Sequence, residues 1–203
     1  MDRCFACSVR CKKRVKIDTE QVKVEPKYGG PEYETLAAIG TNTGITDIMA
    51  VCKGNEMLNY LGLDSISAGA TIAWAMEMAE TGRFVAQGLD EESLRFGSPK
   101  SVLDMIEKIA YRQGVGDLLA EGSLRAARNI GGDAENYVVQ VKGLEVAMHD
   151  PRAMKDMRDN YPVTPTGGDH PGPALKRTSL RNTVEIGRAS CRERVEIAVV
   201  RAS

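Results

Sequence analysis

The chain has 203 residues, enough for one full domain or two small ones and for a hydrophobic core that needs no disulfides. Hydrophobic residues make up 42% and charged residues 27%, and the net charge is −1, a composition that argues against a disordered chain and against a polybasic nucleic-acid-binding protein. Its apolar runs fall far short of the roughly 20 residues that span a bilayer, and its N-terminus lacks a signal peptide's apolar core, so a cytoplasmic protein with no membrane contact is expected.

Two short strands are predicted near the N-terminus, at residues 14–17 and 21–24, because side-chain character alternates there. Gly29, Gly30 and Pro31 then break the pattern, and Pro31 suits the first turn of a helix. The sequence therefore predicts a small β element ahead of a body that is mainly α-helical.

Helical spacing of apolar residues dominates from Glu32 onward. Five helices are expected, at residues 32–39, 46–61, 65–80, 98–112 and 116–130. Residues 137–141 carry β-branched side chains in alternation and predict a strand. Asp150, Pro151 and Arg152 have the cap-plus-proline pattern that opens a helix, and the Pro- and Gly-rich run over residues 161–173 predicts a loop.

Three segments are expected along the chain. Residues 1–30 form the cysteine loop and short strands, and residues 31–184 form a helical domain. Residues 185–203 resemble the translation of a sequencing adapter and are expected to be non-native, which removes Cys191 from the candidate ligands. Met1 stands only three residues before a cysteine motif, so further sequence is expected ahead of it as well as beyond Val184.

The cysteine loop is the first candidate metal site. Cys4, Cys7 and Cys11 place three thiols within eight residues, a spacing that suits one face of an iron–sulfur cube. Zinc is the main alternative, although it usually requires a second cysteine pair or histidines at set distances, and free thiols are a third. The surrounding basic residues either offset the charge of a thiolate-bound cluster or form an ordinary solvated surface; they are Arg3, Arg10, Lys12, Lys13 and Arg14.

Three motifs in order carry a resemblance to a known family. The cysteine loop, then residues 29–35, then residues 59–67, at these distances, resemble the aldehyde ferredoxin oxidoreductase family of tungsten or molybdenum enzymes. The similarity runs from about Cys4 to His170. The resemblance implies a β-rich domain that holds a bis-pterin metal cofactor, followed by two helical domains that bear a [4Fe–4S] cluster. The chain would correspond to the second domain and the beginning of the third.

The resemblance also implies a pterin-binding turn. Asn59, Gly62, Leu63 and Asp64 occupy the family's D-x-x-G-L-D motif, with Asn59 in place of the usual aspartate. The amide of Asn59 and the carboxylate of Asp64 would bind polar ring edges, and Gly62 would let the backbone approach the ligand. The same residues also suit a purely structural role, with Gly62 ending one helix and Asp64 capping the next.

Catalytic residues follow from the same resemblance. Glu32 or Glu34 matches the family's glutamate near the metal, and His170 matches its histidine; the carboxylate would activate water or accept a proton, and the imidazole would orient the substrate carbonyl. Without the resemblance, both glutamates are ordinary first-turn residues and His170 an exposed loop histidine. The resemblance also implies that the fourth cluster cysteine lies further along, beyond Val184. Cys52 is not expected to replace it, because it falls within a predicted helix as a buried thiol.

The resulting functional prediction is an oxidoreductase that converts an aldehyde and water to a carboxylic acid and passes two electrons to ferredoxin. Within the same family, the alternative is a catalytic subunit of an aromatic thioester reductase. Outside the enzymes, the alternative is a small iron–sulfur protein that only carries electrons. A homo-oligomer is compatible with each of these functions. The 203 residues alone are expected to be inactive.

Overall fold

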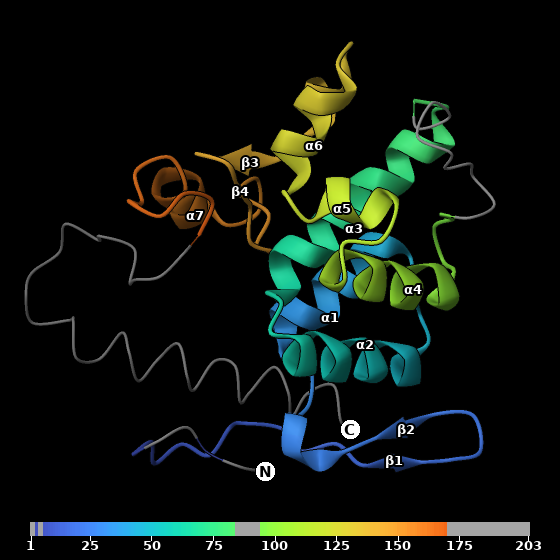
Figure 1. The fold of residues 1–203 in the computed structure, drawn as a ribbon. Coiled ribbons are helices and arrows are strands. Elements are labelled where there is room, and N and C mark those ends of the chain that lie inside the picture. Colours follow the sequence, from blue (N-terminus) through green and yellow to red (C-terminus); the bar gives the residue numbers. More distant parts are fainter. Residues whose placement is uncertain (1–2, 4–5, 84–93, 170–203) are drawn as a thin grey trace, which may run out of the picture.

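The structure, a computed structural model, describes residue 3, residues 6–83 and residues 94–169. Cys4, His170 and residues 185–203 lie outside the described residues. The described part is mainly α-helical, as the sequence predicts (Figure 1). Helices α1 to α5 gather at the centre, the N-terminal hairpin lies on one side of them, and β3, β4 and α7 form a separate group on another.

The N-terminal β element is an antiparallel hairpin of two very short strands, β1 (Ile17–Asp18) and β2 (Lys23–Val24). Each strand is two residues long, so β1 shares only Ile17 with the stretch predicted at residues 14–17. The hairpin is attached to α2 (Ile48–Leu61) by buried Val24 and by the carboxylate of Glu56, which accepts the N–H of Glu25 at 2.7 Å. A 3₁₀ turn at Pro26–Tyr28 leads from the hairpin into the helices.

Helices α1 (Tyr33–Ile39), α2 and α3 (Ser65–Glu80) form the first half of the core close to their predicted bounds. A 3₁₀ turn at Thr41–Thr43 joins α1 to α2. Helix α1 packs against α3 at Gly69, where a Cβ atom would come within 2.6 Å of the Ala38 backbone. No side chain fits in that space, so Gly69 permits the close contact between the two helices.

The second half of the core contains α4 (Pro99–Ala110), α5 (Val115–Leu119) and α6 (Ser123–Ile130). Ser98 caps α4 and Pro99 takes its first position, as predicted. The single helix predicted at residues 116–130 is wrong, because α5 and α6 are separate. Glu145 accepts the N–H and the hydroxyl of Ser123 at 2.8 and 2.7 Å, and these bonds cap α6 from a distant part of the chain.

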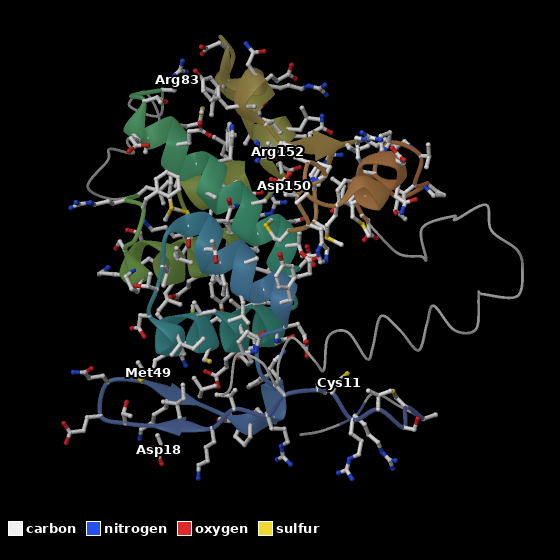
Figure 2. All side chains as sticks on the ribbon, turned by 180° about the vertical axis from the view of Figure 1, so that it is seen from behind. Cys11, Asp18, Met49, Arg83, Asp150 and Arg152 are labelled. Atoms are coloured by element: carbon white, nitrogen blue, oxygen red, sulfur yellow. The ribbon has the colours of Figure 1, made fainter. Side chains whose placement is uncertain are left out.

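The last described segment contains a 3₁₀ turn (Ala134–Tyr137), strands β3 (Gln140–Val141) and β4 (Leu144–Glu145), and α7 (Lys155–Asn160). The strand predicted at residues 137–141 shortens to β3, which pairs with β4. The helix predicted to open at Asp150 is also wrong, since residues 151–153 form turns and α7 begins at Lys155. The carboxylate of Asp150 binds the N–H of Arg152 at 2.8 Å and its guanidinium, so it caps a local turn instead of a helix (Figure 2).

Candidate functional site

The turn between α2 and α3 contains the four candidate pterin-binding residues. Gly62 ends α2 in the left-handed conformation, and the Leu63 N–H closes the turn on the Leu58 carbonyl at 2.9 Å. The Asp64 carboxylate accepts the Ser67 N–H at 2.7 Å and so caps α3. The predicted structural role of Gly62 and Asp64 is therefore present in the fold. One carboxylate oxygen of Asp64 makes the cap, which leaves its pterin-binding role a separate prediction.

This turn forms one wall of a cavity of about 280 Å³. The opposite wall comes from the segment after the cysteine loop and from the start of α1, so residues far apart in sequence meet there. Three candidate residues of the turn line the cavity, namely Asn59, Leu63 and Asp64, together with Glu32. The remaining lining residues are Lys12, Tyr28, Gly30, Thr35, Asn55, Leu58 and Ser65.

Asn55 is a cavity residue that the sequence analysis missed. It lies on α2 one turn before Asn59 and is only 5% exposed. Its side-chain oxygen faces the Asn59 amide at 3.3 Å, but its Nδ2 finds no hydrogen-bond acceptor among the described residues. Because an unsatisfied buried donor costs free energy, this amide is poised to bind a polar group supplied by a ligand. The sequence signal that could have identified it is the spacing of Asn55 and Asn59, which places both side chains on one face of a helix.

The cysteine loop approaches this cavity through the residues that follow it. Cys7 and Cys11 are half-buried free thiols, and Figure 2 places Cys11 on the extended stretch ahead of the hairpin. Within residues 3, 6–83 and 94–169 no three His, Cys, Asp or Glu side chains come together as a metal site. Two of the three cysteines expected to bind a cluster, Cys7 and Cys11, are therefore described, and the ligand roles of all three cysteines stay predictions. Cys52 is buried on α2, where burial and the nearby Asp47 charge raise the pKa of its thiol.

An ion pair joins the cysteine segment to α1. Lys13 Nζ lies 3.0 Å from Glu32 Oε2, and the Gly30 N–H binds the Lys13 carbonyl at 3.0 Å. Gly30 is closely packed here, since a Cβ atom would come within 2.9 Å of the Lys13 side chain. The half-exposed carboxylate of Glu32 is therefore held at the edge of the cavity by the residue that follows Cys11 and Lys12.

Glu34 has a different environment from Glu32. Its Oε1 lies 3.1 Å from Nε2 of His149, and its Oε2 accepts the Met148 N–H at 2.7 Å. Tyr33 stacks on the His149 ring with the centroids 4.9 Å apart and donates its hydroxyl to the Met148 carbonyl at 2.8 Å. Glu34 is not among the residues that line the cavity. The two candidate glutamates therefore lie in separate polar clusters, one beside the pterin motif and one against residues 147–149.

Tyr161 binds the backbone of the second cluster. Its hydroxyl donates to the carbonyls of His149 at 3.0 Å and Ala147 at 3.3 Å. Burial, together with the nearby Glu34 charge, raises the pKa of Tyr161 to about 12, so its hydroxyl stays a donor at neutral pH. His170, the histidine that the resemblance pairs with a glutamate, lies outside the described residues. No local sequence signal pointed to His149, which is 115 positions from Glu34.

Comparisons with known proteins give the family context of this geometry. A family model described as aldehyde ferredoxin oxidoreductase, domains 2 and 3, matches residues 1–200. Tungsten-containing aldehyde ferredoxin oxidoreductases of Pyrococcus furiosus and Thermococcus kodakarensis are each 38% identical over 168 residues, covering 82% of this chain. The WOR-like subunit of an aliphatic sulfonate oxidoreductase from P. furiosus is 32% identical over 176 residues. The chain spans 27% of the length of these relatives.

One solved structure supports the fold. The active-site complex BamBC of benzoyl coenzyme A reductase, in complex with 1,5-dienoyl-CoA, superposes with a TM-score of 0.57 and 24% identity. The match covers 72% of this chain and 21% of that one. In the part of the chain that the structure describes, no helix is both long enough and apolar enough to cross a membrane.

Proposed function

The chain belongs to the aldehyde ferredoxin oxidoreductase family, and we propose that the protein oxidises an aldehyde and water to a carboxylic acid. Each turnover would release two protons and two electrons, and ferredoxin would accept the electrons one at a time. The residues of the α2–α3 turn would hold a tungsten bis-pterin centre, and the cysteine loop would hold a [4Fe–4S] cluster. The family is one of tungsten-containing oxidoreductases, as its named relatives state. The proposal goes beyond family membership in naming an aldehyde as the substrate and ferredoxin as the electron acceptor.

The observation that carries the proposal is the cavity beside the α2–α3 turn. Its volume is near the lower end of ligand pockets, about 300 Å³, which suits the ring of a larger cofactor better than a whole bis-pterin. Leu58 and Leu63 supply apolar walls, and the buried Asn55 Nδ2 supplies a donor that has no acceptor in the described residues. The residues present therefore fit a pterin ring, which combines flat apolar faces with polar edges.

The chain's own residues would bind the cofactor and handle protons. Asn59 and Asp64 would bind the polar edge of the pterin, while Lys13 would keep Glu32 at the rim of the cavity. A tungsten bis-pterin centre, when bound, supplies the two-electron oxidation. Either Glu32 or Glu34 would accept a proton from the water that adds to the aldehyde.

The residues of the cysteine loop also fit a cluster. Cys7 and Cys11 are half-buried thiols on one short loop, and Cys4 is expected to complete this side of the cluster. Reconstitution of the chain with iron and sulfide under anaerobic conditions should produce visible absorbance that Cys7→Ala abolishes. Cys52→Ala is the matched control, because that thiol is buried on α2 and should leave the absorbance unchanged. Stoichiometric binding of zinc without iron would show that the cluster assignment is wrong.

The surface around the loop supports an acidic electron carrier as partner. Arg10, Lys12, Arg14 and Lys16 are exposed, and no carboxylate among the described residues lies within ion-pair distance of them. Residues 3–16 contain no acidic side chain. Opposite charge would steer ferredoxin to the cluster and make its reduction slower at high salt.

The direct test is an assay of the full gene product prepared anaerobically. We expect aldehyde to reduce two equivalents of ferredoxin and to appear as the carboxylic acid. The second candidate is a catalytic subunit of a larger complex, which the 32% identical subunit relative favours. An aromatic thioester and an aliphatic sulfonate belong in the same assay for this reason. Turnover of either one without turnover of any aldehyde would replace the proposed function by this alternative.

A further inference from the structure

We propose that His149 is the residue that positions Glu34, through a hydrogen bond from its Nε2–H to the Glu34 carboxylate. This inference rests on the proposed function in one respect, namely that Glu34 acts as the group that accepts a proton during turnover. The Nε2 atom lies 3.1 Å from Glu34 Oε1, and the two side chains are 26% and 18% exposed. A partly buried pair with a charged acceptor is stronger than an ordinary surface contact.

The geometry gives each oxygen of Glu34 its own donor. The Met148 N–H binds Oε2 at 2.7 Å, and His149 faces Oε1. A carboxylate held at both oxygens has its plane fixed, which matters for a base that must meet a bound substrate in one orientation. The two donors come from consecutive residues, so a single stretch of backbone sets the direction of the Glu34 carboxylate.

That stretch of chain is itself held by three contacts. Tyr33 stacks on the imidazole at an interplanar angle of 22° and donates to the Met148 carbonyl. Tyr161 donates to the His149 carbonyl at 3.0 Å. The imidazole therefore has little freedom to turn away from Glu34, and its orientation follows from the packing around it. This arrangement is typical of a residue that orients another, as a ligand's outer partner does in metal sites.

The pairing makes a prediction about the position of a proton. A backbone N–H can only donate, so the site at Met148 always requires an oxygen. In wild type the second carboxylate oxygen faces His149, whose Nε2 must then carry the proton. In Glu34→Gln the amide oxygen takes the Met148 site, and the amide NH₂ faces His149. Nε2 must then become an acceptor, so the proton moves to Nδ1.

Nitrogen-15 NMR of the histidine side chains in the full chain tests this directly. The chain has only two histidines, so the spectrum is simple, and His170→Gln assigns it. At mildly alkaline pH, where an ordinary imidazole is neutral, we expect the Nε2–H tautomer for His149 in wild type and the Nδ1–H tautomer in Glu34→Gln. Glu32→Gln is the matched control, since Glu32 binds Lys13 instead, and it should leave His149 unchanged. The same tautomer in wild type and Glu34→Gln overturns the proposal.

A second measurement separates positioning from mere packing. In the full gene product, His149→Phe keeps the stacked ring but removes the donor, and His149→Gln supplies an amide donor near the position of Nε2. We expect His149→Phe to lower kcat by roughly tenfold to a hundredfold with little change in KM, and His149→Gln to restore most of the loss. Equal kcat in wild type and His149→Phe overturns the proposal. If wild type oxidises no aldehyde, the proposed function fails, and the tautomer experiment still decides whether His149 holds Glu34.

Discussion

The helical core and the polar clusters beside it are stabilised in different ways. In the core, α3 presents apolar side chains that are fully buried, such as Ile72 and Met76. At the polar clusters, residues 147–149 are attached to α1 by hydrogen bonds to Tyr33 and Glu34, and only Ala147 among the three is buried. The core therefore depends on volume, which many sequences can supply. The polar clusters depend on particular donors and acceptors, which allow few replacements.

The largest effect is expected from a cavity in the core. Met76 is fully buried on α3, and Met76→Ala should lower the free energy of unfolding by about 2–5 kcal/mol, because the transfer free energy is lost and the space is not refilled. Met49→Ala is the matched control, since that side chain on α2 is 39% exposed and should change the free energy far less. Denaturant titration of the three proteins measures both values. Equal losses would show that the core is not packed as described.

A buried polar junction should give the next largest effect. Glu145 is 5% exposed, and its Oε1 accepts from Thr71 and from the N–H and hydroxyl of Ser123, which connects β4 to α3 and α6. Glu145→Leu should cost about 1–3 kcal/mol in total, because it leaves the buried Ser123 N–H without its acceptor. Glu145→Gln retains an oxygen for these donors and should cost less. If Leu and Gln destabilise equally in denaturant titrations, the junction contributes only by its volume.

The same contrast explains which elements were predictable from sequence. The bounds of α2 and α3 follow from local signals, since Gly62 and Asp64 end one helix and cap the next. The break between α5 and α6 also has a local signal, Gly122, which takes a φ of 84° directly before α6, but the bonds from Ser123 to Glu145, 22 positions away, could not be read from the sequence. Local hydrogen bonding misled the prediction at Asp150, whose carboxylate binds Arg152 and forms a turn instead of a helix cap.

The candidate site was predictable to a similar extent. The motif at Asn59 to Asp64 and the acidic pair at Glu32 and Glu34 could be read as short patterns in the sequence. The separation of the two glutamates into different clusters could not, because it depends on which distant donor meets each of them. Lys13 is close in sequence to Glu32, whereas His149 reaches Glu34 only through the fold of β3 and β4.

A smaller effect is expected from the carboxylate that attaches the hairpin. Burial of Glu56 opposes ionisation, but the Lys53 ammonium at 2.5 Å and the Glu25 N–H outweigh it, so the pKa of Glu56 lies below its ordinary value. A lowered folded pKa stabilises the protein above the unfolded value of about 4.3, and this stabilisation is lost as the pH falls through the folded pKa. The melting temperature of the wild type should therefore be higher than that of Glu56→Gln near neutral pH. The difference between the two melting temperatures should shrink in acid. Glu20→Gln, in the exposed turn of the hairpin, should show no such gap.

The smallest effect is expected from removing residues 185–203, which lie outside the described residues. Their arginines and glutamates follow no core-facing period, and their apolar run at Ile197 to Val200 is too short to anchor a domain. Ordering such a segment costs on the order of 1–2 kcal/mol per residue in backbone entropy, and a segment of adapter origin, as predicted from the sequence, would have no apolar face to offset that cost. A chain ending at Val184 should thus melt within about one degree of the full chain, because about one degree corresponds to well under 1 kcal/mol for a domain of this size. A marked loss of thermal stability would show instead that the segment packs as native protein, and Cys191 would then return as a candidate for the fourth cluster ligand.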